Sequence, residues 1–282
     1  MNRRVFRRLK SNAMTFVLMA CVLFAVLPLL FILGTLLLKG AGSLSIDFFT
    51  KMPAPAGENG GGVANAIVGT LIVTGIGSLM AIPIGIISAV YMSEYAGSRF
   101  ASLVRFAADT LNGVPSIVIG VFVYGIAVLP VKHYSALAGS IALGVMMIPI
   151  IARTTEELLL LVPNTMREGA LALGATRARA VFSVVLPAAL PGIVTGVLLA
   201  LSRIAGETAP LIFTSLNNPY FSTALREPIA TLTVQVYNLS HEPYPDSHRQ
   251  AWAGALVLVL IVLLCSLLAR FATRRLARMA RA

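Results

Sequence analysis

Six long stretches of this 282-residue chain contain no charged residue. A helix needs about 20 apolar residues to cross roughly 30 Å of bilayer hydrocarbon, and each stretch reaches that length. Only 12% of the residues are charged and the mean hydropathy is +0.87, so bilayer is the expected solvent. The sequence predicts an all-α membrane protein with six transmembrane helices, within residues 11–38, 59–93, 110–131, 133–152, 180–202 and 250–269.

Basic residues lie at the ends of these stretches and predict the orientation. With both termini in the cytoplasm, the inner segments hold 16 Lys and Arg residues and the outer segments hold five. This excess agrees with the positive-inside rule for multi-pass membrane proteins. The net charge of +11 is therefore interpreted as a topology signal, and no nucleic-acid surface is expected.

The first stretch, 11–38, also follows a basic segment in the manner of a signal peptide. It is about twice as long as a typical signal h-region and lacks a clear cleavage site, so we predict a first transmembrane helix. Prolines and glycines before residue 63 then mark a boundary. The predicted units are an N-terminal tail, first transmembrane helix and external loop (1–62), a five-helix transmembrane domain (63–270) and a basic cytoplasmic tail (271–282).

The cysteines and histidines do not predict chemistry. Cys21 and Cys265 each lie alone inside a predicted span, which is typical of packing thiols. His133 is isolated, and His241 and His248 lie in a loop without the ligand spacing of a metal site. We predict no bound metal and no catalytic residue.

Small residues recur at every fourth position in the second and fifth predicted spans. Such stripes let helix backbones approach closely, because lipid gives helices no hydrophobic reason to associate. The predicted packing residues are Gly77, Ala81, Gly85, Ala89, Gly192 and Gly196.

Two charges continue the stripe of the fifth span. Arg203 and Glu207 follow Ala200 at i+3 and i+7, which places them on the same helical face. A charge inside a membrane costs about 2.5–3.5 kcal/mol and usually marks a transport pathway. The alternative is a static pair within one helix, worth only about 0.2–0.5 kcal/mol.

The segment between the fourth and fifth spans predicts a small elbow on the cytoplasmic side. Thr165 is expected to cap a short helix with Glu168 in its first turn, and Gly174 is expected to end that helix. A second short helix then leads to Pro187, where the chain is expected to change direction. The alanines here are too small to anchor in lipid as an interfacial helix would, so docking into a groove of a partner is favoured.

Residues 217–249 form the longest predicted external segment. Asn217-Asn218-Pro219 breaks it, and residues 229–239 are predicted to form a short helix. We interpret this segment as a cap that faces an external receptor.

Three further motifs establish a resemblance to a known family. They are Asn112-Gly113-Val114-Pro115-Ser116-Ile117-Val118-Ile119-Gly120, Arg153-Thr154-Thr155-Glu156-Glu157 and Gly206-Glu207-Thr208-Ala209-Pro210-Leu211. With the elbow, they resemble phosphate ABC transporter permeases of the PstA type over about residues 63–270. One difference is Gly169, where the family more often has alanine.

The resemblance implies a type I importer permease fold in the bacterial inner membrane. This chain would form half of a phosphate pathway, with a companion permease, two ATPase subunits, an external phosphate-binding protein and surrounding lipid as partners. It would bind no cofactor and would not be an enzyme, because ATP with Mg is used by the ATPase and no P-loop motif occurs in the sequence. The implied EAA coupling residues are Glu168, Gly169, Ala170, Gly174, Ala175, Leu186 and Pro187.

Within this family reading, Arg203 becomes the predicted anion contact. A helix that begins near Pro187 places it about 24 Å along the axis, beyond the midplane. Its forked donors match phosphate oxygens. Glu207 is expected to hold that side chain when phosphate is absent, and Thr208 completes the predicted pathway. Asp109, with Asn112, is a second polar cluster for which a pathway role and simple helix capping both stay open.

Other functions also stay open. One arginine suits sulfate or molybdate as well as phosphate. A self-contained secondary carrier would need ion-coupling residues in its spans, and a nonconducting assembly subunit would carry Arg203 and Glu207 as a structural pair.

Overall fold

The computed structural model describes residues 3–55, 57–58 and 60–279 and confirms the all-α prediction. Within those residues, β-type pairing is limited to one isolated bridge between Pro53 and Gly61. The long helices are α1 (Arg3–Gly40), α3 (Ala64–Glu94), α6 (Ala136–Leu160), α9 (Leu186–Ile204) and α12 (Pro245–Met279). The shorter ones are α2 (Ile46–Thr50), α4 (Arg99–Gly113), α5 (Ser116–Val123), α7 (Asn164–Ala172), α8 (Arg177–Ala180), α10 (Ala209–Thr214) and α11 (Leu232–His241).

The third predicted span is a broken helix rather than a single rod. In the described part of the chain, five helices are long and apolar enough to cross a membrane, and the bent pair of α4 with α5 and its extension to Val128 makes a sixth. The two halves meet at 106°. Pro115 disfavours a helical residue before it, and Val114 is indeed extended, with ψ 131°. The predicted helix over 110–131 is therefore wrong as one continuous element.

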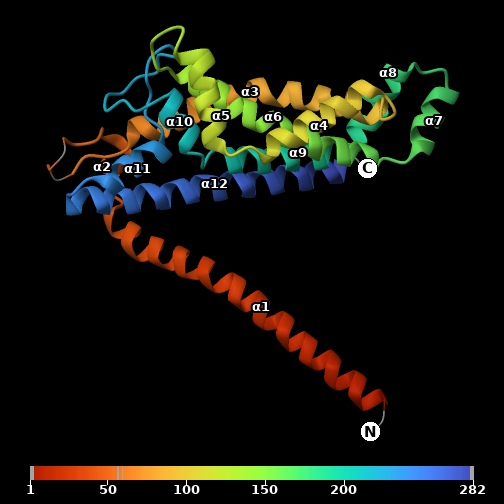
Figure 1. Cartoon of the computed structure of the whole chain (residues 1–282), viewed down its shortest axis with the longest axis horizontal. Coiled ribbons are helices and arrows are strands. Elements are labelled where there is room, and N and C mark those ends of the chain that lie inside the picture. Colours follow the sequence, from red (N-terminus) through yellow and green to blue (C-terminus); the bar gives the residue numbers. More distant parts are fainter. Residues whose placement is uncertain (1–2, 56, 59, 280–282) are drawn as a thin grey trace.

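The bundle consists of α3, α6, α9 and α12, which run side by side, while α1 diverges from them (Figure 1). Over its most apolar window α1 has no buried residue, as expected for a helix whose surroundings are lipid or another chain. Its last turn contacts α12, where the Lys39 ammonium lies 4.9 Å from the centroid of the Trp252 ring. This cation–π contact fixes the end of α1 at the bundle.

The predicted stripe on α3 lies against α6. A β-carbon on Gly77 would lie 2.9 Å from the carbonyl oxygen of Ser140, and one on Gly85 would lie 2.8 Å from Ile151. Ala81 and Ala89 are fully buried. The absence of side chains thus allows the two backbones to approach closely.

The stripe on α9 also lies against α6, nearer the C-terminal end of that helix. A β-carbon on Gly192 would lie 2.8 Å from the Leu158 side chain, and one on Gly196 would lie 3.1 Å from the Thr154 hydroxyl. Helix α6 is therefore the central element, with α3 and α9 packed on it.

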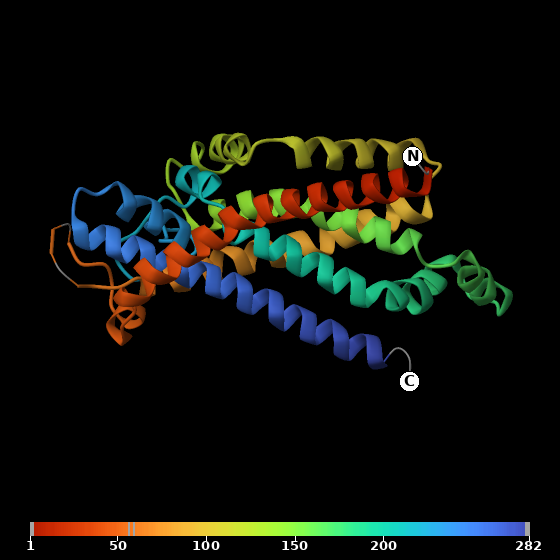
Figure 2. The same ribbon diagram turned by 90° about the horizontal axis from the view of Figure 1, so that it is seen from below.

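The two ends of the molecule differ. Both termini and the α7–α8 elbow lie at one end, whereas α2 and α11 lie at the other (Figures 1 and 2). This arrangement fits the predicted topology, with the first end cytoplasmic. Helix α12 continues through residues 271–279 of the predicted basic tail, and residues 1–2, 56, 59 and 280–282 of the predicted units lie outside the described residues.

The external segment packs on the outer end of α3. Its helix, α11, covers most of the predicted range 229–239 but begins three residues later, because residues 229–231 cross α3 in extended form. A β-carbon on Gly69 would lie only 1.9 Å from the carbonyl oxygen of Ala230. Leu232 continues the contact by donating its amide to the Thr70 hydroxyl at 2.8 Å.

Candidate transport and coupling sites

The elbow, which is predicted to be cytoplasmic, consists of α7 and α8, joined at Gly174. Gly174 has φ +83°, the left-handed conformation that favours glycine. Its amide donates to Leu171, and the amide of Ala175 donates to Ala170, at 2.9 and 3.1 Å. These two bonds form a Schellman motif, which ends α7 as the sequence predicted. Thr176 then caps α8 by accepting from the amide of Arg179.

The start of α7 differs from the prediction. Thr165 does not cap it, because α7 begins at Asn164, directly after Pro163, and no side chain provides an N-terminal cap. Pro163 has φ −56° and leads straight into the helix, so Thr165 already lies in the first turn. Glu168 is therefore not the partner of a capping box.

Most residues of α7 are exposed. No residue of α7 is buried, and a β-carbon on Gly169 would meet no atom within 4 Å. Glu168 is exposed, and Ala170 and Ala175 are half-buried. The predicted coupling residues from 168 to 175 thus lie on a projecting surface at the end that carries both termini (Figure 1).

The chain does not change direction at Leu186-Pro187. Helix α8 continues through a π-helical segment, η3 (Val181–Val185), into α9, so residues 177–204 form one continuous helix. Pro187 lies in the first turn of α9. The predicted change of direction is wrong, because the wider π turn lets the helix pass a proline that lacks an N–H donor.

One arginine of α7 bonds to two transmembrane helices. Arg167 donates from Nε to Glu94 at 3.1 Å, from Nη1 to the carbonyl of Val162 at 2.7 Å, and from Nη2 to the carbonyl of Leu159 at 2.9 Å. Glu94 is the last residue of α3, Leu159 lies in the last turn of α6, and Val162 follows shortly after that helix ends at Leu160. The sequence reading counted Arg167 only as an inner basic residue.

Arg203 and Glu207 do not share a helical face. Helix α9 ends at Ile204, and the amide of Glu207 turns back to donate to Ile204 at 3.0 Å. Among the described residues, no ion pair joins Arg203 to Glu207. The predicted common face is wrong, because the Ala205-Gly206 turn interrupts the helix. Arg203 is exposed and Glu207 is half-buried.

The loop that follows α9 is held against α5. Thr208 precedes α10, which has Pro210 in its first turn. A β-carbon on Gly120 would lie 2.6 Å from Cα of Pro210, so the glycine permits this contact. The hydroxyl of Thr233 donates to the carbonyl of Glu207 at 2.9 Å. The motifs at 112–120 and 206–211 therefore meet in space.

A charged network joins α4 to the inner end of α6. The Glu156 carboxylate is 1% exposed and accepts from Arg105 and Arg153. Arg153 also pairs with Asp109 at 2.7 Å, whereas Asn112 is exposed. Sequence reasoning singled out Asp109 but missed the partners, although the i, i+3 spacing of Arg153 and Glu156 was visible.

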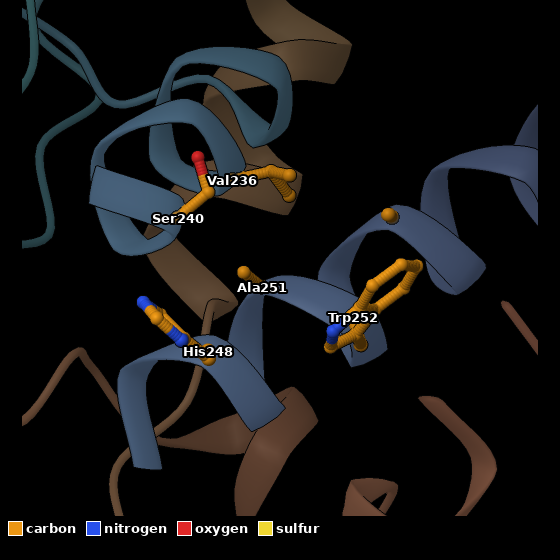
Figure 3. A pocket seen from close by; sticks show the side chains of 6 residues that line it. Val236, Ser240, His248, Ala251 and Trp252 are labelled. Atoms are coloured by element: carbon orange, nitrogen blue, oxygen red, sulfur yellow. The ribbon is translucent and has the colours of Figure 1, made fainter. Parts of the chain in front are cut away.

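A pocket of about 330 Å³ lies between α11 and α12 at the external end. Val236 and Ser240 approach it from α11, and His248, Ala251 and Trp252 approach it from α12 (Figure 3). Arg203, Glu207 and Thr208 are not among its lining residues. The lining is mainly apolar, so this pocket does not resemble an anion site.

These features define a multi-pass membrane subunit whose helices cross the bilayer around a central helix and whose elbow projects from one end. The chain belongs to the family of binding-protein-dependent transport system inner membrane components, whose sequence profile matches residues 81–282. Such a subunit is part of a transporter and is not itself an enzyme.

Relatives are similar along nearly the whole chain. The phosphate transport system permease protein PstA of Haemophilus influenzae is 46% identical over 243 residues, covering 86% of each chain. PstA of Yersinia pestis is 43% identical, covering 95% of this chain and 91% of its own. A protein of Methanocaldococcus jannaschii named as a probable PstA is 34% identical, covering 96% of both.

Solved structures show the same fold at lower identity. A subunit of a bacterial alginate ABC transporter has a TM-score of 0.69 at 15% identity, covering 97% of this chain and 98% of its own. A subunit of the inward-facing methionine transporter MetNI has a TM-score of 0.61 at 22% identity, covering 76% of this chain and 94% of its own. The type I importer permease fold is confirmed.

Proposed function

We propose that this chain is the permease subunit of an ATP-driven phosphate importer and forms half of the pathway for inorganic phosphate. The observation that carries the substrate is the 43–46% identity to two phosphate permeases over most of the chain. Its partners would be a companion permease, two ATPase subunits and an external phosphate-binding protein, in a bacterial inner membrane.

The elbow is the proposed contact with the ATPase. Glu168, Gly169, Ala170, Gly174 and Ala175 project from the bundle, and none is buried within this chain. Leu186 and Pro187 lie on the continuous helix that leaves the elbow. ATP with Mg would be bound by the ATPase, which supplies the energy through nucleotide-dependent contacts with this surface.

Arg203 is the proposed anion contact, and its exposure supports this role. A guanidinium near the end of a membrane helix needs water or protein around it, and here the chain itself does not cover it. A pathway between two permeases provides such surroundings. Glu207 and Thr208 follow in the turn held against α5, so the pathway residues are anchored by the Gly120–Pro210 contact.

Transport would follow from alternation between inward and outward openings. ATP shifts this equilibrium only if the ATPase contacts the two permease conformations with different affinity. The elbow is the proposed place of those differential contacts, because it is the projecting surface at the cytoplasmic end.

The test is uptake by the reconstituted complex. Vesicles that contain both permeases and the ATPase, with binding protein and ATP on opposite sides, are expected to accumulate radiolabelled phosphate. Unlabelled phosphate should compete, whereas sulfate and molybdate should not. If sulfate competes and unlabelled phosphate does not, the substrate is another oxyanion. If this chain takes up phosphate without the ATPase, it is a self-contained carrier.

A further inference from the structure

The elbow needs a mechanical connection to the membrane helices, and hydrophobic packing does not supply it for α7. No residue of α7 is buried. At one end α7 follows Pro163, and at the other it turns at Gly174 into the α8–α9 helix. A side chain that bonds α7 to other helices is therefore important for the position of α7.

Arg167 has the geometry for this task. Outside α7, its guanidinium uses Nε, Nη1 and Nη2 on three acceptors at 2.7–3.1 Å, and Nη1 also donates to Oδ1 of Asn164 within α7 at 3.3 Å. The side chain is only 18% exposed. The Leu159 and Val162 carbonyls lie where α6 ends, and terminal carbonyls of a helix lack partners within it. A cation is also favoured at that end by the helix dipole.

Glu94 extends the connection to α3. Its carboxylate is 20% exposed and accepts from Nε at 3.1 Å. Helices α3 and α6 already pack closely at Gly77 and Gly85. One guanidinium thus joins α7 to the ends of two helices that pack closely on each other.

We propose that Arg167 is a positioning residue that transmits displacement of the α7 elbow to α3 and α6, with Glu94 as its acceptor on α3. This inference rests on the proposed function. Three rigid donors in one plane are required, because the acceptors come from different elements. Lysine keeps the charge but cannot reproduce the fork.

The variants are Arg167→Met, Arg167→Lys and Glu94→Gln in the full complex, with Arg99→Met as the control. Arg99 is an exposed arginine at the start of α4 near the same end of the bundle. Assembly, ATP hydrolysis and radiolabelled phosphate uptake are measured in the same vesicles. The ratio of phosphate imported to ATP hydrolysed is the deciding quantity, because a role in folding alone lowers the amount of complex and leaves this ratio unchanged.

Arg167→Met is expected to assemble and hydrolyse ATP but to lower the transport ratio roughly tenfold, within the usual range for coupling between linked sites. Arg167→Lys should lie between it and the wild type, and Glu94→Gln should lower the ratio by about threefold because only the α3 connection weakens. Arg99→Met should match the wild type. A wild-type ratio in Arg167→Met overturns the inference; if that variant does not assemble, a wild-type ratio in Glu94→Gln overturns it.

A second measurement does not depend on the substrate. Two spin labels are attached at Leu173→Cys, on the exposed tip of the elbow, and at Gly97→Cys, after α3. Cys21 and Cys265 are replaced by serine, and the distance between the two labels is measured. Arg167→Met should broaden the distance distribution, and an unchanged distribution would contradict the proposal. If the wild-type complex moves no phosphate but Arg167→Met still broadens the distribution, only the proposed function is rejected.

Discussion

The Arg105 guanidinium and the Glu156 carboxylate join the amphipathic helix α4 to the central helix α6, with Nε 2.9 Å from Oε1. Arg105 also donates to the carbonyl of Met92 near the end of α3 at 3.3 Å. Glu156 is almost fully enclosed, whereas Arg105 keeps 27% of its side chain exposed. This pair therefore connects three helices at the end of the bundle that is predicted to be cytoplasmic.

Glu156→Gln is expected to destabilise the subunit by roughly 3 kcal/mol, because Arg105 would lose its carboxylate partner at a buried site while Arg153 keeps only Asp109. The melting temperature of the detergent-solubilised complex measures this effect. Glu157→Gln is the matched control, because Glu157 is the next residue and is exposed. Equal melting temperatures for the two variants would show that the network does not support the fold.

Gly69→Ala is expected to disrupt the external end of the bundle. The added methyl group would lie 1.9 Å from the Ala230 carbonyl oxygen, which belongs to the backbone and cannot rotate away. Gly75→Ala is the control on the same helix, since nothing lies within 4 Å of its β-carbon. Protease cleavage in the 217–231 segment should rise in the first variant alone, and equal cleavage would contradict the close approach.

Gly174→Ala is expected to weaken the elbow by about 1 kcal/mol, because the left-handed conformation disfavours a side chain. Gly169→Ala provides the opposite change: it replaces a glycine inside α7, has open space around it and should favour the helix by about 1 kcal/mol. Hydrogen exchange of the α7 amides measures both effects. Faster exchange in Gly174→Ala and slower exchange in Gly169→Ala are expected, and the reverse order would contradict the assigned helix end.

Arg203→Ala is expected to abolish phosphate uptake while assembly and ATP hydrolysis persist. A hydrogen bond to a charged group contributes about 1.5–3 kcal/mol, so a loss of tenfold or more is expected even if water replaces the side chain. Arg249→Ala, which removes an exposed arginine at the external end, should transport normally. Normal uptake by Arg203→Ala would remove the proposed anion contact.

The long charge-free stretches of the sequence made the membrane helices predictable. A charge-free window of about 20 residues has few alternatives to a membrane helix. Helix α3 ends one residue beyond such a window, and α6 begins inside another and continues past its end to Leu160. The same criterion concealed the bend at Pro115, because an apolar window does not register whether its helix is continuous. Gly174 was predictable from local backbone chemistry, since a glycine after a short helix favours the left-handed turn.

The contacts of the site depended on tertiary structure. Arg167 and Glu94 are 73 residues apart, so nothing local associates them. Arg203 and Glu207 showed the opposite error, because helical spacing suggested a shared face while the backbone had already turned at Ala205. Pro187 was misread for a similar reason: the π segment before it accommodates a residue that usually interrupts a helix.

Because residues 177–204 form one helix, the proposed ATPase contact and the proposed anion contact of this subunit share a single lever. At 1.5 Å per residue the lever is about 42 Å long, and a tilt of about 10° around its middle moves its two ends by about 4 Å in opposite directions. Movement of Thr176 toward the axis of the bundle would then mean movement of Arg203 away from that axis. When the pathway opens at one membrane face it would then close at the other. The stiffness of the helix alone would couple the two movements.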